Sequence, residues 1–147
     1  MTAALDRRRR GTLCAIAALA LSLPAAPVAA QDPRGGEAQN AARAWLALSD
    51  NQNAAESWEA TDSKFKNAMS VERWTTSLQQ VRGPLGAVVQ RTVLSTRFTK
   101  SLPGLPPGDY AVVVFRSSFE HKTSIQETVT LDHGSDGIWR VAGYALA

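Results

Sequence analysis

Y-A-V-V-V-F (Tyr110–Phe115), E-T-V-T-L (Glu127–Leu131) and I-W-R-V-A-G-Y (Ile138–Tyr144) are three runs that together decide the fold we predict. They are rich in β-branched and aromatic residues, which favour strands. Short polar segments separate the runs, and Asp136-Gly137 is a strong signal for a tight turn between two strands. The last forty residues of the chain therefore predict antiparallel strands, against which the upstream residues pack.

Another long strand is predicted before these runs, because Val and Thr are frequent from Ala87 onward. The four strands that we expect are Ala87–Phe98, Tyr110–Phe119, Ser124–Leu131 and Ile138–Leu146. The loop S-L-P-G-L-P-P-G (Ser101–Gly108) cannot pair as a strand, since it holds three prolines. It either folds back onto the sheet or presents Leu102 and Leu105 to a partner. Both faces of Tyr110–Phe119 are apolar, so its inward face stays open.

Three helices are predicted upstream of the strands. The first covers about Glu37–Ser49 and has an apolar stripe at helical spacing, formed by Ala41, Ala44, Trp45 and Leu48. The second begins after Asn53, which can cap it together with Glu56. One face of this second helix holds Trp58, Thr61 and Phe65, and Ser63–Met69 is either its end or a separate turn.

The third helix has the clearest boundaries. Ser70 is a good N-cap, and the apolar residues at helical spacing are Val71, Trp74, Leu78 and Val81. Gly83-Pro84 ends the helix, with the glycine expected in the left-handed conformation. Helices that precede a set of antiparallel strands indicate an α+β fold. We therefore expect three N-terminal helices packed on a curled four-stranded antiparallel sheet, as a half-open cone around an apolar centre.

The first thirty residues are typical of a secretory signal peptide. Arg7–Arg10 form a basic head, Gly11–Leu23 is a short apolar run, and Val28-Ala29-Ala30 is a small-residue end, with cleavage expected after Ala30. A transmembrane anchor is the alternative, but the apolar run has 13 residues where a bilayer needs roughly 20. A lipoprotein would need a cysteine at the end of this run, and Cys14 lies at its start.

Cleavage changes the charge of the protein. The whole chain has 16 basic and 13 acidic residues. Removal of four arginines and of Asp6 leaves 12 of each, so the high pI reflects the signal and predicts no nucleic-acid or membrane surface. Cys14 is the only cysteine, which leaves no disulfide or thiolate after cleavage. We expect a disordered lead at residues 31–36, one domain at residues 37–147, and a periplasmic or secreted product.

The chain resembles a bacterial family called domain of unknown function 4019. The stretches that carry the resemblance are A-W-L-A-L (Ala44–Leu48), S-W-E (Ser57–Glu59), Trp74, P-L-G (Pro84–Gly86), D-Y (Asp109-Tyr110), E-T-V-T-L (Glu127–Leu131) and G-I-W-R-V-A-G-Y (Gly137–Tyr144). The resemblance implies a cone-shaped fold similar to cystatin-like or nuclear transport factor 2-like domains. It implies no activity and no catalytic residues.

Known catalytic and metal-binding patterns are missing from the sequence. His121 and His133 are expected at opposite ends of one strand, about 30 Å apart, so a shared metal is not expected. Gly134–Gly137 (G-S-D-G) joins two strands and opens no helix, which predicts a hairpin turn and not a nucleophile or phosphate loop. We therefore predict no catalytic set, no cofactor and no metal.

Glu127 is the candidate acid–base residue. Alternation places it on one strand face with Ile125, Val129 and Leu131, where a carboxylate needs a partner or has a raised pKa. In cone-shaped enzymes such a buried acid can act as a general base. The alternative is an ion pair with Arg116 or Arg140 on a neighbouring strand, or a place at an exposed sheet edge.

Aromatic residues are the other candidates for a pocket, although large aromatics usually fill a core. The candidate pocket residues are Trp58, Phe115, Glu127, Trp139 and Tyr144. Our leading hypothesis is a non-catalytic exported domain that binds a protein partner or a small apolar ligand. The alternatives are an isomerase- or dehydratase-type enzyme using Glu127, and a structural homodimer formed across the open sheet face.

Overall fold

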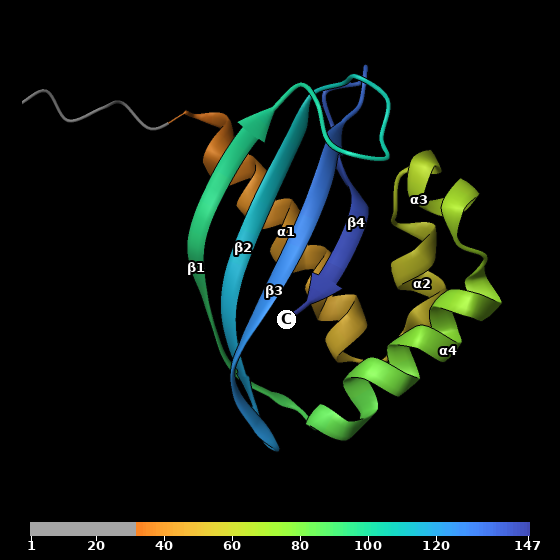
Figure 1. The fold of residues 1–147 in the computed structure, drawn as a ribbon, viewed down its shortest axis with the longest axis vertical. Coiled ribbons are helices and arrows are strands. Elements are labelled where there is room, and N and C mark those ends of the chain that lie inside the picture. Colours follow the sequence, from red (N-terminus) through yellow and green to blue (C-terminus); the bar gives the residue numbers. More distant parts are fainter. Residues whose placement is uncertain (1–31) are drawn as a thin grey trace, which may run out of the picture. The chain divides into compact units, whose positions relative to one another are not determined.

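The computed structural model describes residues 32–147, so the predicted signal peptide lies outside the described residues. Helices precede strands along the chain, as predicted (Figure 1). The helices are α1 (Arg34–Asp50), α2 (Ala54–Glu59), α3 (Ser63–Ala68), α4 (Val71–Arg82) and the 3-10 helix η1 (Gly83–Leu85). The strands are β1 (Val88–Thr99), β2 (Tyr110–Phe119), β3 (Lys122–His133) and β4 (Trp139–Leu146).

The four strands form one antiparallel sheet in the order β1-β2-β3-β4, which confirms the α+β class. Phe115 pairs with Val93 on one side and with Glu127 on the other. Cross-strand partners share a face, so these side chains lie on the inner face of the sheet. This settles the inward face of β2, whose inward side chains are buried: Ala111, Val113, Phe115, Ser117 and Phe119.

Helix α1 crosses the inner face of the sheet, behind the strands in Figure 1, while α2, α3 and α4 lie beyond the edge at β4. Ala38 and Ala42 are completely buried, and such small side chains let a helix approach a sheet closely. Trp45 is buried as predicted, but Ala44 is exposed, and Ala41 and Leu48 are only partly buried. The predicted stripe therefore lies to one side of the face that α1 packs on the sheet.

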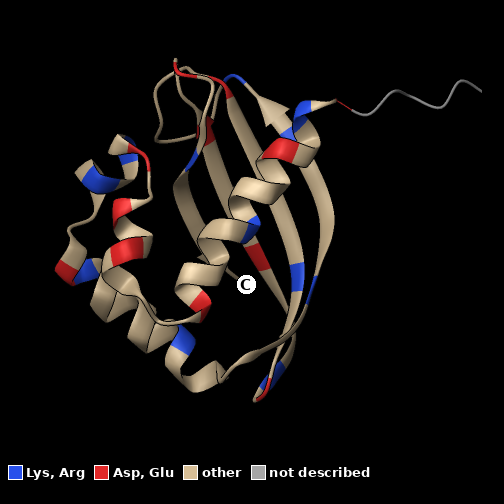
Figure 2. Ribbon diagram, turned by 180° about the vertical axis from the view of Figure 1, so that it is seen from behind, with Lys and Arg blue, Asp and Glu red and all other residues tan. Residues whose placement is uncertain are grey.

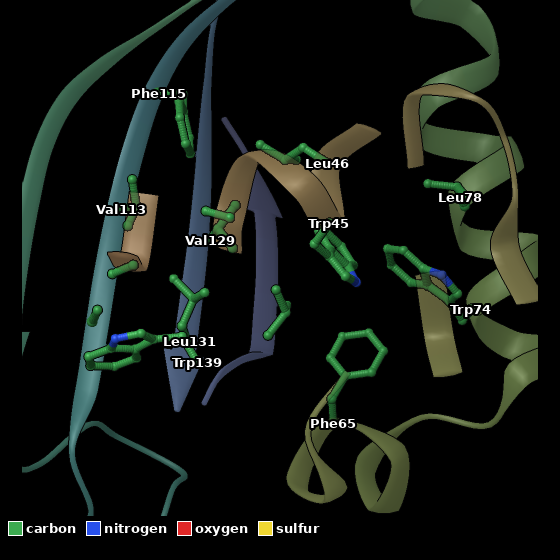
Figure 3. Close-up of a cluster of buried hydrophobic side chains, with 14 of the residues drawn as sticks. Trp45, Leu46, Phe65, Trp74, Leu78, Val113, Phe115, Val129, Leu131 and Trp139 are labelled. Carbon is green, nitrogen blue, oxygen red and sulfur yellow. The ribbon is translucent and has the colours of Figure 1, made fainter. Parts of the chain in front are cut away.

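Aromatic side chains of α1, α3 and α4 lie together in the core (Figure 3), and Tyr144 of β4 packs against them. Trp45 contacts Trp74 and Tyr144 at centroid distances of 5.7 and 5.3 Å. The backbone oxygen of Ser57 accepts the indole N–H of Trp45 at 2.8 Å, and its hydroxyl accepts that of Trp74 at 2.9 Å. Ser57 is completely buried, so one small polar residue satisfies two indole donors inside the core.

The helix caps explain where the predicted helices begin. Asn53 accepts a hydrogen bond from the amide of Glu56, and Ser70 accepts one from the amide of Arg73, which confirms both caps. The described part of the chain forms four α-helices where three were predicted. The reason is Asp62, whose side chain caps α3 and whose amide donates to the carbonyl of Val141 in β4.

The predicted disordered lead is wrong for Arg34–Gly36, which form the first turn of α1. The side chain of Asp32 accepts the amide of Arg34 at 2.9 Å. The guanidinium of Arg34 donates to Asp109 at 2.9 Å and lies over the ring of Phe98. These contacts with residues far along the chain hold a glycine-containing turn in helical form, which local composition does not reveal.

The end of α4 also differs from the prediction. Gly83 has a φ of −51°, so it continues into η1 and is not left-handed. The left-handed glycine is Gly86, with a φ of 75°. Val81 is 46% exposed, and Arg82 is buried in the place expected for an apolar residue. The stripe of α4 thus runs through Trp74, Leu78 and Arg82.

The proline-containing loop folds back onto the sheet. The hydroxyl of Tyr110 donates to the carbonyl of Pro106 at 2.6 Å, and Leu102 and Leu105 are partly buried. The predicted tight turn between β3 and β4 is confirmed, with Gly137 at a φ of 77°. No helix among residues 32–147 combines the length and the apolar character that a membrane span requires.

Candidate functional site

Glu127 lies at the centre of a buried polar cluster on the inner face of the sheet. Its side chain is completely buried, and the neighbours Ile125 and Val129 on the same face are buried as well, as the alternation predicted. Both carboxylate oxygens are engaged. Oε2 accepts from Arg91 Nε at 2.6 Å and from Ser117 Oγ at 2.5 Å, while Oε1 accepts from Tyr144 at 2.7 Å.

A second carboxylate completes the cluster from the end of α1. Asp50 accepts hydrogen bonds from the guanidinium of Arg91 at 2.7 and 3.0 Å. Arg82 contacts the same aspartate and also lies 3.4 Å from Glu127. In Figure 2, acidic and basic positions of α1, α4 and the strands behind them gather in this region. Two acids and two arginines therefore alternate, and their charges cancel.

The electrostatics of the cluster stabilise the charged forms of Asp50 and Arg91 and the neutral form of Tyr144. Burial acts to raise the pKa of Asp50, but hydrogen bonds from Arg91 and Arg82 outweigh it, so this pKa lies below its usual value. Burial alone would lower the pKa of Arg91. Its hydrogen bonds with the two carboxylates outweigh burial, so this pKa lies above its usual value. The pKa of Tyr144 is raised, mainly by burial and then by the charge of Glu127.

The ion-pair partners that we predicted for Glu127 are wrong. Arg116 follows Phe115, the cross-strand partner of Glu127, and so points to the opposite face of the sheet, where it is exposed. Arg140 pairs with Asp132 across the strands and binds Asp136 at 2.8 Å. The true partners, Arg82 and Arg91, come from α4 and β1.

This geometry limits the chemistry of Glu127. A general base needs an oxygen that can reach the proton of a substrate, and both oxygens here are occupied by protein donors. Glu127 lines none of five depressions of about 280–470 Å³ on residues 32–147. The contacts of the cluster hold α1, α4 and the strands β1, β3 and β4 together.

The other candidate pocket residues do not form one cavity. Phe115 is completely buried, and Tyr144 belongs to the polar cluster. The indole N–H of Trp58 donates to the carbonyl of Met69 at 2.7 Å. Only Trp139 lines one of the five depressions, and it does so at the edge of the sheet.

That depression is an open groove between α1 and β4 of about 440 Å³. We call it the α1–β4 groove; it is lined by Ala41, Ala44, Trp45, Leu48, Ala60, Ile138, Trp139, Arg140 and Val141. Arg140 is the only ionisable residue among these, and Ile138 is 51% exposed. The stripe predicted to be core on α1 thus forms one wall of an apolar surface groove.

Sequence reasoning missed Asp50, Arg82, Arg91 and Ser117. A signal existed for two of them. Arg82 continues the spacing of Trp74 and Leu78 at steps of four residues, and Ser117 alternates with Phe115 and Phe119. A polar residue in an apolar series is a candidate for a buried polar contact.

Metal binding has no obvious site in this part of the chain. Residues 32–147 contain no group of three or more His, Cys, Asp or Glu that could hold an ion. His121 lies in the β2–β3 turn, and His133 ends β3. The ring of His133 stacks on Trp139 at a centroid distance of 4.4 Å.

The fold and the cluster define an α+β domain whose helix-covered sheet is tied together by buried ion pairs and carries an apolar groove at one edge. Comparison with known families identifies it further. The chain belongs to the family described as protein of unknown function (DUF4019), which matches residues 41–144. This confirms the resemblance seen in the sequence. No curated protein matches the chain.

Proposed function

We propose that the protein is an exported, non-catalytic domain that binds an apolar segment of a partner protein in the α1–β4 groove. The observation that carries this proposal is a partly exposed apolar stripe on a helix whose other apolar face is already buried. Ala41, Ala44 and Leu48 follow helical spacing but face the groove. An apolar surface patch of this kind suits an intermolecular contact.

A partner segment suits the groove better than an enclosed small ligand. Ala44, Ala60 and Ile138 are exposed, so the groove is a trough on the surface. Small-molecule sites usually surround most of the ligand surface. The alanines of α1 would let the backbone of an incoming helix or strand approach closely, while Leu48 and Ile138 would pack against its side chains.

An enzyme that uses Glu127 is the weaker alternative. Its carboxylate would first have to release Arg91 or Tyr144, which would leave a buried charge or hydroxyl unpaired at a cost of roughly 1–3 kcal/mol or more. The structural homodimer is also weaker, since a two-fold axis on the open sheet face would bring Arg97 and Arg116 towards their own copies.

We also propose that the domain has a cone-type fold. A long helix across the inner face of an antiparallel sheet supports a relation to cystatin-like and nuclear transport factor 2-like domains. Such folds host many binding functions.

Export is proposed from the basic, apolar and small-residue order of residues 1–30. The test is to produce the full chain in a bacterium with a periplasm and to measure the mass of the protein released from it. We expect a chain that begins at Gln31. Retention of Met1 in a membrane fraction would contradict export.

Groove binding can be tested with a library of displayed twelve-residue peptides, selected on residues 31–147. We expect apolar peptides to be enriched and their affinity to fall more than about tenfold in Ala44→Glu, because a carboxylate would be buried without a partner. The matched control is Ala47→Glu, which makes the same change at an exposed position of α1 outside the groove.

Two results would count against this function. Equal loss of affinity in both variants would show that binding is not located in the groove. If the domain instead binds the uncharged dye Nile red tightly at the groove and enriches no peptide, the natural ligand is a small apolar molecule.

A further inference from the structure

The sheet surface away from α1, which we call the outer face, is covered by no helix of residues 32–147 (Figure 1). We propose that this face docks an extended acidic segment of a partner protein, with Arg116 as the central contact. Alternation and cross-strand pairing along the four strands assign its members, which are Gln90, Thr92, Ser95, Arg97, Thr99, Tyr110, Val112, Val114, Arg116, Ser118, Ser124, Gln126, Thr128, Thr130, Asp132, Arg140, Gly143 and Ala145.

The outer face has a one-sided charge. Its one acid is Asp132, which is buried and bound to Lys64 at 2.9 Å. Of its three arginines, Arg140 is bound to Asp136 at 2.8 Å, whereas Arg97 and Arg116 have no ion pair within residues 32–147. The field above these two arginines therefore favours an anion.

Arg116 differs from the arginines that serve the fold. Arg82, Arg91 and Arg140 each contact a carboxylate. Arg116 has no hydrogen bond or ion pair with any residue in the described part of the chain, and it is exposed. Its planar guanidinium is therefore available for a bidentate contact with a carboxylate from outside.

Two shallow depressions, of about 280 and 340 Å³, meet at Arg116. Hydroxyl and amide side chains line them on β1, β2 and β3, namely Gln90, Thr92, Ser118, Ser124 and Gln126. Leu94 lines both and is 47% exposed, because it lies at the register shift between Val93 and Ser95. The surroundings of the cation thus offer hydrogen bonds and apolar contacts with Leu94 and Ile125.

The spacing of the two arginines favours an extended occupant. Arg97 aligns with Val112, four residues along β2 from Arg116 and one strand away, which places the two positions about 14 Å apart. An extended chain presents residues i and i+4 on one side at about 13 Å. Two acidic residues four positions apart would therefore reach both arginines.

Other occupants fit less well. A second copy of this chain would bring arginine towards arginine. A nucleic acid would need exposed aromatic platforms for its bases or more cations. The outer face has two arginines without an ion pair within residues 32–147, and its one aromatic residue, Tyr110, is buried. An anionic membrane surface also favours larger basic clusters.

The experiment is a titration of residues 31–147 with a ten-residue synthetic peptide that carries two glutamates four positions apart, followed by the backbone NMR signals. We expect signals of the outer face to shift and affinity to fall as salt rises. Arg116→Gln and Arg97→Gln should each weaken binding roughly fivefold, the upper range for an exposed ion pair. A peptide with glutamines in place of the glutamates should not bind.

Arg73→Gln is the matched control, because Arg73 is exposed on α4 and its loss changes the net charge equally. Equal weakening by Arg73→Gln would reduce the effect to net charge and overturn the proposal. Signal shifts in the α1–β4 groove alone would also overturn it. If vesicles of phosphatidylglycerol bind through Arg116 while the peptide does not, the occupant is a membrane and the assignment is wrong.

Discussion

Arg91 Nε lies 2.6 Å from Glu127 Oε2. The most buried acid of the sheet is therefore paired with an arginine of the edge strand β1. The remaining nitrogens of this arginine bind Asp50 at the end of α1. One guanidinium thus connects β1, β3 and the long helix. Removing either partner leaves an uncompensated charge inside the fold, which is the costly way to break a buried pair.

Glu127→Gln should destabilise the domain by about 3–5 kcal/mol, because it leaves two arginines facing one carboxylate. Urea denaturation followed by tryptophan fluorescence measures this loss. The control is Glu59→Gln, where the side chain is 70% exposed and binds Lys66. This change should cost less than about 1 kcal/mol. Equal stability of wild type and Glu127→Gln would contradict the structural role of the cluster.

The cluster should make stability fall in acid. Hydrogen bonds from Arg91 and Arg82 outweigh burial and lower the pKa of Asp50 in the folded state, so the unfolded chain takes up its proton first. The stability that Asp50 contributes is therefore present above about pH 4 and is lost as pH falls through the folded pKa.

Asp50→Asn should cost roughly 1.5–3 kcal/mol at pH 7 and should flatten the decline below pH 4. Denaturation midpoints between pH 7 and pH 2 provide the measurement. An unchanged acid slope in the variant would show that other carboxylates cause the decline.

Tyrosine ionisation provides an independent test of burial. The chain has two tyrosines, and the pKa of each is raised: that of Tyr110 mainly by burial, that of Tyr144 by burial and then by Glu127. Absorbance at 295 nm should therefore show no tyrosinate as the folded protein passes pH 10. Because the pKa of both tyrosines is raised in the folded state, the stability that their burial contributes is present below about pH 10. It is lost as the pH rises through the folded pKa values.

Tyr144→Phe should halve the absorbance change that appears on alkaline unfolding and should cost about 1–3 kcal/mol, because Glu127 loses a donor. A tyrosinate signal at pH 10 in the folded wild type would contradict the buried position of Tyr144.

Two neighbouring glycines should respond in opposite ways to alanine. Gly86 has a φ of 75° and a ψ of −164°, and an added Cβ would lie 2.7 Å from Glu120 Oε2. Gly86→Ala should destabilise the domain by about 1–3 kcal/mol. Gly83 has helical angles and nothing within 4 Å of an added Cβ, so Gly83→Ala should stabilise by about 0.4–1 kcal/mol. Thermal unfolding of both variants is the check, and the reverse order would contradict the boundary described for α4.

Local patterns predicted most of the secondary structure. Runs of Val and Thr with Asp136-Gly137 predicted the strands and the last hairpin, and Asn53 and Ser70 marked helix starts. The errors arose where distant contacts decide. Asp62 caps α3 and binds β4, Asp109 holds Arg34 in the first turn of α1, and Arg82 takes the place expected for an apolar residue.

Alternation along β3 was enough to place Glu127 inside the sheet, because successive side chains of a strand point to opposite faces. Its partners could not be predicted in this way, since Arg82 and Arg91 lie 45 and 36 residues away in sequence. The helical spacing of Ala41, Ala44 and Leu48 was visible in the sequence, but spacing alone does not say which of two apolar faces packs on the sheet. Only the tertiary structure, by laying Ala38 and Ala42 against the strands, turned that stripe into the wall of a surface groove.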